Sequence, residues 1–254
     1  MSNLIDVTGT FHSDKHKNID DYMKLSIKED NVEFEVVYGD LGDKSKFLSK
    51  QQFLDLKEYL TTQSEYVNKG ESESLDIKTE YKNKYKSFPS SLRLSIEGIS
   101  QIKKYCKHDL LEELDYTIIN KLKYTDPKNP SLKFDSLNSK EYPCRVNLKK
   151  ESPVDKYSKE GSIFTNNWPT KNKSFRYKKR YSFLTKNKLW RIDLTAVKQT
   201  KGGEYFKTFK SSNLLRNKEI FELEIEYVGN NDLDNLCSYS GNPVLINAPK
   251  TIVA

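Results

Sequence analysis

The segment from Phe221 to Tyr227 reads Phe-Glu-Leu-Glu-Ile-Glu-Tyr, alternating four large apolar residues with three glutamates. Successive side chains of a β-strand point to opposite faces, so the segment predicts a strand with its carboxylates on one face and its apolar side chains on the other. Carboxylates about 7 Å apart on one face repel each other unless cations neutralise them. The segment is therefore either the solvated face of an antiparallel sheet or a face that meets positive charge.

Seven other segments are predicted as strands, at 32–38, 75–81, 91–97, 116–124, 143–149, 174–183 and 188–198. Several of them carry the same alternation, with charge of both signs on the polar face. The aligned polar residues are Glu33 and Glu35; Arg93 and Glu97; Arg145 and Lys149; Arg176, Lys178 and Arg180; and Arg191, Asp193 and Thr195. Ordinary solvent faces mix in more Thr, Ser and Gln, so this density of charge is unusual.

Two architectures fit this pattern. A sandwich would turn the charged faces to water. A closed barrel of about eight strands would turn its apolar faces outward against helices and point its charges into a lumen that fits side chains or one small ligand. In the barrel, acidic and basic strands would neutralise each other across the lumen and hold a metal-bound polyanion. Periodicity alone does not separate the two arrangements.

The remaining segments divide into helices and loops. We expect helices at 17–28, 49–63 and about 98–107, the second opened by the capping box Ser49-Lys-Gln-Gln52. Segments 65–74, 125–140 and 152–172 are predicted to be loops, and residues beyond 229 a short helix and an extended tail. We expect one domain spanning 1–254, with its core at about 30–230 and tails at 1–15 and 238–254.

Composition narrows the class of ligand. A formal net charge of +7 suits a polyanionic partner. Three widely spaced cysteines and three histidines argue against a disulfide framework and a thiolate zinc site. Any metal would be held by oxygen, which favours Mg²⁺ or Mn²⁺. No apolar run approaches the length of a membrane span, so we expect an intracellular protein with no membrane partner.

Four motifs, in this order along the chain, carry a resemblance to a known family: Glu33-Phe-Glu35, Arg176-x-Lys178-x-Arg180, Arg191-Ile-Asp193-Leu-Thr195 and Glu222-Leu-Glu224-Ile-Glu226. The chain resembles the RNA triphosphatases of the tunnel metalloenzyme superfamily, in the branch of fungal and large-DNA-virus mRNA capping enzymes, especially those of mimivirus type. Val37 stands where the thiamine-triphosphatase and adenylate-cyclase branch has lysine. The resemblance implies a mainly β (α+β) fold, an eight-stranded antiparallel closed barrel with helices packed outside.

The resemblance also implies an activity, the removal of the γ-phosphate from 5′-triphosphate RNA as the first step of mRNA capping, with Mg²⁺ or Mn²⁺ as cofactor. The implied metal ligands are Glu33, Glu35 and Glu226. Glu222, Glu224 and Asp193 would complete the catalytic site, Asp193 fitting equally a structural role of holding an arginine. Glu151 is the nearest candidate for the carboxylate that orients water. The implied phosphate-binding residues are Arg93, Lys149, Arg176, Lys178, Arg180, Arg191 and Lys198.

Other activities stay open at this stage. A sister hydrolase of free nucleoside triphosphates or inorganic polyphosphate fits the same residues, and so does a non-catalytic RNA-binding barrel. The chain has no K-x-D-G motif, so guanylyltransferase and methyltransferase activities would reside in other domains or subunits. Lys201-Gly202-Gly203 indicates a turn rather than a phosphate loop. The resemblance places the protein in the host cytoplasm or in the virion of a large DNA virus.

Overall fold

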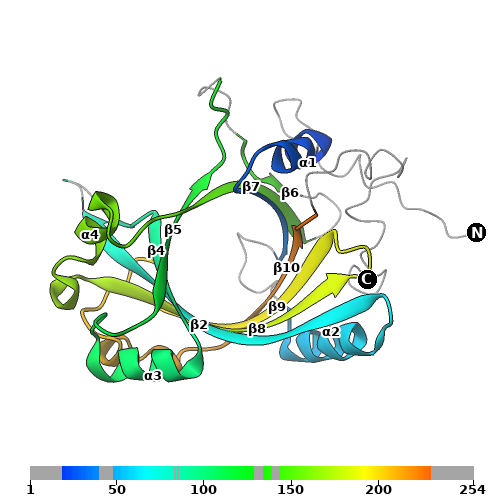
Figure 1. Ribbon diagram of the computed structural model, residues 1–254. Coiled ribbons are helices and arrows are strands. Elements are labelled where there is room, and N and C mark those ends of the chain that lie inside the picture. The colour runs from blue at the N-terminus through cyan, green and yellow to red at the C-terminus, as the bar shows by residue number, and fades with distance from the viewer. Residues whose placement is uncertain are drawn as a thin grey trace, which may run out of the picture.

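The computed structural model describes residues 19–39, 48–82, 84, 86–128, 134–138 and 143–229. The predicted tails, and the helix expected beyond 229, lie outside these residues. Within them the chain forms the barrel rather than the sandwich. Going round the barrel, the order is β1, β10, β9, β8, β2, β4, β5, β7, and β7 pairs back with β1. Figure 1 shows these eight strands as a ring seen end-on.

All pairings between neighbouring barrel strands are antiparallel. The barrel strands are β1 (Val32–Tyr38), β2 (Tyr66–Lys82), β4 (Leu92–Glu97), β5 (Tyr116–Lys123), β7 (Cys144–Pro153), β8 (Lys173–Thr185), β9 (Trp190–Gln199) and β10 (Ile220–Tyr227). Two short strands that the sequence did not predict, β3 (Ser87–Pro89) and β6 (Leu137–Asn138), pair with β2 and β7.

Three predicted loops are partly wrong. Segment 65–74 belongs to β2, because its backbone pairs with β8 from the Tyr66–Thr185 register onward and needs no apolar alternation of its own. Segment 152–172 contains the end of β7, helix α4 (Lys159–Thr165) and the 3-10 turn η3 (Trp168–Thr170). Segment 125–140 contains β6, and its Phe134 and Leu137 are buried.

The other helices cover the outside of the ring, as expected. Helices α1 (Ile19–Lys28) and α2 (Lys50–Thr62) lie on one side in Figure 1, and α3 (Ile99–His108) and α4 on the other. The capping box at the start of α2 is confirmed, because the Ser49 hydroxyl accepts a hydrogen bond from the Gln52 amide while the Gln52 side chain accepts one from the Ser49 amide. No helix in the described ranges is long and apolar enough to cross a membrane.

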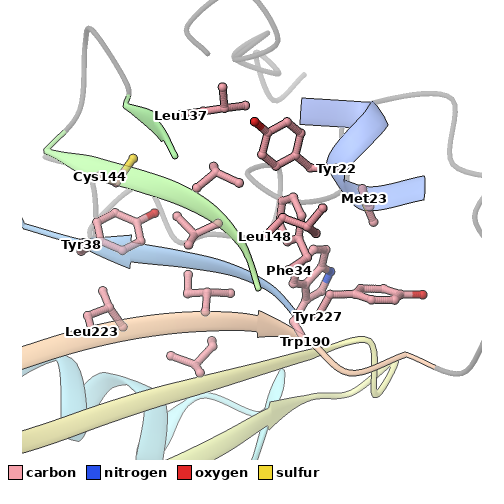
Figure 2. Packing of buried hydrophobic residues seen from close by; sticks show 14 of the residues in the cluster. Tyr22, Met23, Phe34, Tyr38, Leu137, Cys144, Leu148, Trp190, Leu223 and Tyr227 are labelled. Atoms are coloured by element: carbon pink, nitrogen blue, oxygen red, sulfur yellow. The ribbon is translucent and has the colours of Figure 1, made fainter. Parts of the chain in front are cut away.

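Two apolar clusters hold the helices to the barrel. The first joins α1 and α2 to the outer faces of β1, β7, β9 and β10; Figure 2 shows Phe34, Leu148 and Leu223 in it, with Tyr22 and Met23 of α1 packed against it. The second joins α3, α4 and the 3-10 turns η3 and η5 (Leu214–Arg216) to β2, β4, β5 and β8. The strands therefore bury their apolar faces outward, and the alternating charged residues point inward.

Candidate active site: a charged tunnel

A cavity of about 580 Å³ fills the barrel, and side chains of all eight barrel strands line it. Eight acidic and nine basic residues contribute to the lining, so the site is close to neutral despite its density of charge. They are Glu33, Glu35, Glu73, Asp76, Glu97, Glu151, Glu224 and Glu226, with Lys78, Arg93, Lys121, Lys149, Arg176, Lys178, Arg180, Arg191 and Lys201.

The three glutamates predicted to bind metal lie on neighbouring strands. Glu35 of β1 is the direct register partner of Glu226 of β10, and Glu33 is two residues away on the same face. In this structure each carboxylate meets a cation: Glu33 pairs with Lys121 at 2.7 Å, Glu35 pairs with Lys149, and Glu226 pairs with Arg191. Burial raises the pKa of Glu226 to about 7, and the neighbouring carboxylate of Glu33 adds to the rise against the effect of Arg191.

These residues fit a hard divalent cation in chemistry. Their donors are carboxylate oxygens from adjacent strands, which are the ligands that Mg²⁺ and Mn²⁺ prefer. Their side chains do not converge as they lie, since no group of three or more His, Cys, Asp or Glu residues comes together as a metal site within the described ranges. Each carboxylate would have to turn from its lysine or arginine to bind an ion.

The predicted catalytic carboxylates separate into two groups. Glu224 and Glu151 line the cavity. Glu222 and Asp193 are 8% and 2% exposed and do not line the cavity. Both pair with arginines that do. Glu222 pairs with Arg176, and Asp193 lies 3.3 Å from Arg180 and 3.0 Å from Arg191. The Ser182 hydroxyl also donates to Asp193 at 2.6 Å. This arrangement favours the structural role for Asp193.

The basic strand β8 points Arg176, Lys178 and Arg180 into the cavity. Lys178 pairs with Asp76 at 2.7 Å, and Arg180 lies 3.6 Å from Glu224. The Nε atoms of both arginines are buried and have no hydrogen-bond acceptor among the described residues, and the same holds for Nε of Arg93. Buried donors without acceptors are costly, so the cavity wall has unused capacity for an anion.

Glu151 of β7 lies between two cations from the neighbouring strands β5 and β4. Its carboxylate is 2.6 Å from the Lys121 ammonium and 3.5 Å from the Arg93 guanidinium. Burial alone would raise the pKa of Glu151, but Lys121 and Arg93 outweigh burial, and the pKa is lower than usual. Glu151 therefore stays a charged acceptor in the cavity.

One predicted phosphate ligand is wrong. Lys198 lies on the outer face of β9, where its ammonium donates to the Leu215 carbonyl at 2.8 Å and does not line the cavity. The register explains this, because Lys198 is opposite Tyr177, whereas the inward residues Arg176 and Lys178 are opposite Gln199 and Val197.

Sequence reasoning missed several lining residues. Asp76 and Lys78 alternate with Leu75 and Ile77, so the period-two pattern of β2 could have indicated them. Lys121, which pairs with three carboxylates, had no such signal, because adjacent Ile118 and Ile119 break the alternation of β5. Asn147 was missed as well; its amide donates to Glu35 at 3.0 Å.

No protein-family model matches the sequence, and no curated protein matches it. Among solved structures, the mimivirus capping enzyme triphosphatase matches with a TM-score of 0.55 and 20% sequence identity, over 87% of this chain and 93% of that chain.

A looser likeness is to the Pct1 RNA triphosphatase of S. pombe, with a TM-score of 0.47 and 14% identity, over 87% of this chain and 79% of that chain. The chain therefore has the tunnel fold of the mimivirus capping enzyme triphosphatase, a closed antiparallel barrel whose interior is lined with charge.

Proposed function

We propose that this protein is a metal-dependent RNA 5′-triphosphatase that converts a 5′-triphosphate end into a 5′-diphosphate end and inorganic phosphate. The observation that carries the proposal is the closed tunnel itself, in which strands bearing the R-x-K-x-R motif meet strands bearing glutamates around one cavity. The structural neighbour of 20% identity is a capping enzyme triphosphatase, which supports the same activity here.

The basic residues would bind the triphosphate. Arginine offers forked donors and lysine a point charge, and phosphoryl transfer depends mostly on positioning and on stabilisation of negative charge. Arg93, Arg176 and Arg180 line the cavity, and the buried Nε of each has no hydrogen-bond acceptor among the described residues. Lys149, Lys178 and Arg191 complete the set that we assign to phosphate binding.

Glu33, Glu35 and Glu226 would hold Mg²⁺ or Mn²⁺. A bound ion would neutralise charge on the transferring phosphate oxygens. The lining supports a requirement for a metal ion, because it is nearly neutral and a triphosphate carries about four negative charges. Glu224 lies 3.6 Å from Arg180 and would orient the Arg180 guanidinium toward the phosphates.

Glu151 would accept a hydrogen bond from the attacking water. Its lowered pKa keeps it ionised, and Lys121 and Arg93 hold it in place at the cavity wall. The water oxygen bonds to the γ-phosphorus, the bond from that phosphorus to the β,γ-bridging oxygen breaks, and the diphosphate end leaves with the electron pair. One proton of the water stays on the released phosphate, and the other passes to solvent by way of Glu151. Asp193 and Glu222 would position arginines without touching the substrate.

This reaction would be the first step of mRNA capping. The chain would act as a single tunnel domain, and guanylyltransferase and methyltransferase domains or subunits would act on its product. These partners, and a location in the host cytoplasm or in a virion, remain part of the proposal.

The test is phosphate release from γ-labelled triphosphate RNA with Mg²⁺, with Mn²⁺ and with EDTA. We expect release only with metal and loss of release in Glu224→Ala. Glu219→Ala, which removes an exposed glutamate just before β10, is the matched control and should retain activity. No release by the folded wild type with either metal would reject the enzyme. Faster turnover of free ATP or tripolyphosphate than of RNA would favour the sister hydrolase.

A further inference from the structure

One end of the tunnel is formed by a loop rather than by strands alone. The connection that follows β9 contributes Lys201, Gly202, Gly203 and Tyr205 to the cavity lining, next to Pro89 of β3. The sequence indicated only a turn here. The turn is present, closed by a hydrogen bond from the Glu204 amide to the Lys201 carbonyl at 3.1 Å, and it also forms part of the tunnel mouth.

The backbone fixes the direction of Tyr205. The next residue, Phe206, pairs with Lys173 through two backbone hydrogen bonds of 2.8 Å and packs against the second apolar cluster. Neighbouring residues of an extended segment point to opposite sides. Tyr205 is therefore directed into the mouth while Phe206 is directed into the core, and its ring is half-exposed in that position.

The rim around Tyr205 is open. Gly203 has a φ of +84°, a conformation that suits glycine, and a Cβ atom at Gly202 or Gly203 would meet nothing within 4 Å. The nearby carboxylate of Glu80 is already engaged, accepting from Asn172 at 2.8 Å and lying 3.5 Å from Lys82. A chain that leaves the tunnel beside Tyr205 therefore meets no side chain from Gly202 or Gly203, and the Glu80 carboxylate beside it is already paired.

A cation without a partner lies just inside the mouth. Of the basic side chains on the barrel strands that line the cavity, Lys78 alone makes no ion pair with a described residue. Lys78 is opposite Ser174 at the start of β8. Burial lowers the pKa of Lys78, and the positive charges of Arg93, Lys121 and Arg176 lower it further against the effect of Asp76.

From this geometry we propose that the mouth formed by Lys78, Tyr205 and the Lys201–Gly203 turn is the end through which substrate enters, with a subsite for the first nucleoside. The base of that nucleoside stacks on the Tyr205 ring, and Lys78 binds the phosphate closest to it. The substrate class is then a triphosphate attached to a nucleoside, not inorganic polyphosphate. This inference rests on the proposed function for its substrate, but its test does not depend on turnover.

The experiment measures equilibrium binding of a short 3′-fluorescent 5′-triphosphate oligoribonucleotide by anisotropy, in EDTA and in Ca²⁺, with tripolyphosphate as competitor. Stacking of one base on an aromatic ring contributes about 1–3 kcal/mol. We therefore expect Tyr205→Ala to weaken RNA binding by about 5-fold or more. The competition constant of tripolyphosphate should not change. Tyr205→Phe should retain RNA affinity, and Lys78→Met should weaken both ligands.

Tyr157→Ala is the matched control, since Tyr157 is 81% exposed and does not line the cavity. Equal losses for RNA and tripolyphosphate in Tyr205→Ala, no loss for either, or no RNA binding by the wild type would each overturn the subsite. Selective loss of RNA binding in a protein that releases no phosphate would support the subsite while rejecting the proposed function.

Discussion

The inner and outer faces of the barrel are made by the same eight strands and are held together in opposite ways. Phe34 on the outer face is fully buried and packs edge-on against Trp190, with ring centroids 6.1 Å apart. Glu33, the residue before it, faces the cavity and pairs with Lys121. Burial of apolar surface stabilises the outer face, whereas buried ion pairs lose in desolvation much of what they gain in attraction.

The outer face therefore provides most of the stability of the fold, and the inner face provides the charged groups for its chemistry. Because the inner ion pairs contribute little net stability, they can exchange partners when a triphosphate and a metal enter. The outer clusters cannot rearrange in this way without exposing apolar surface. Changes to the outer face should therefore act on folding, and changes to the inner face on activity.

The largest expected effect is on the outer face. Phe34→Ala should lower the free energy of unfolding by about 3–5 kcal/mol, because it leaves a cavity in the first apolar cluster. Urea unfolding at neutral pH measures it. The neighbouring change Glu33→Gln should cost less stability, because Lys121 keeps the carboxylate of Glu151 at 2.6 Å, and it should abolish metal-dependent phosphate release. Similar destabilisation by the two variants would contradict the assignment of stability to the outer face.

One ion pair on the inner face, that of Asp76 with Lys178, is expected to contribute to folding stability. Asp76 is 6% exposed, lies 2.7 Å from Lys178, and accepts a hydrogen bond from Ser95 at 2.8 Å. Asp76→Asn leaves Lys178 without its carboxylate, so we expect a loss of about 2–3 kcal/mol in urea unfolding at pH 7.

This loss should depend on pH in one direction. Burial would raise the pKa of Asp76, but Lys178 and Arg93 more than compensate, so the folded pKa lies below the ordinary 3.8. The stability from Asp76 is present above about pH 4 and is lost as the pH falls through the folded pKa. The wild type and Asp76→Asn should converge in acid; a constant difference down to the lowest pH would contradict this account.

The next effect is the pH dependence of folding stability, which we expect to come from Lys173 on the outer face. Lys173 is fully buried, donates to the carbonyls of Trp168 and Lys171 at 2.9 Å, and has its pKa lowered by burial to about 8. Between pH 8 and 10.5 the unfolded chain binds more protons at this lysine than the folded chain, so folding stability rises with pH.

Lys173→Met should remove that rise, which we expect to be about 3 kcal/mol across the window. Thermal or urea unfolding at several pH values compares the two proteins. Lys186→Met, an exposed lysine just after β8, is the control and should keep the wild-type slope. Parallel stability curves for wild type and Lys173→Met would show that Lys173 is not the titrating group.

The smallest effect concerns a helix that covers the outer face. Ser49→Ala removes the hydroxyl of the capping box that opens α2 and should cost about 1 kcal/mol. Phe53 of α2 packs against Phe221 and Tyr181, so fraying of the first turn should loosen this contact. Thermal unfolding measures the loss, and phosphate release below the transition should be unchanged. Ser49→Asp, which can also cap, should restore stability.

The period-two alternation of 32–38, 174–183, 188–198 and 219–228 predicted the strands and the residues that share their faces, because the pleat leaves each side chain only two directions. The motif residues Glu33, Arg176 and Arg191 lie in the cavity for this reason. The alternation did not predict the structure of segments that are ordered by tertiary contacts. Segment 65–74 is polar and becomes strand by pairing with β8, and Trp168 is buried in a segment that reads as loop.

Alternation by itself determined which residues of each strand lie together, but not which face is inside. That was decided by closure: β7 pairs with β1, helices cover the apolar faces, and the charged faces are left to meet around one cavity. Only the tertiary structure brought Lys121 to Glu33 and Glu151, placed Lys198 outside, and set Tyr205 at the mouth. These depend on register between strands distant in sequence, which local periodicity does not encode.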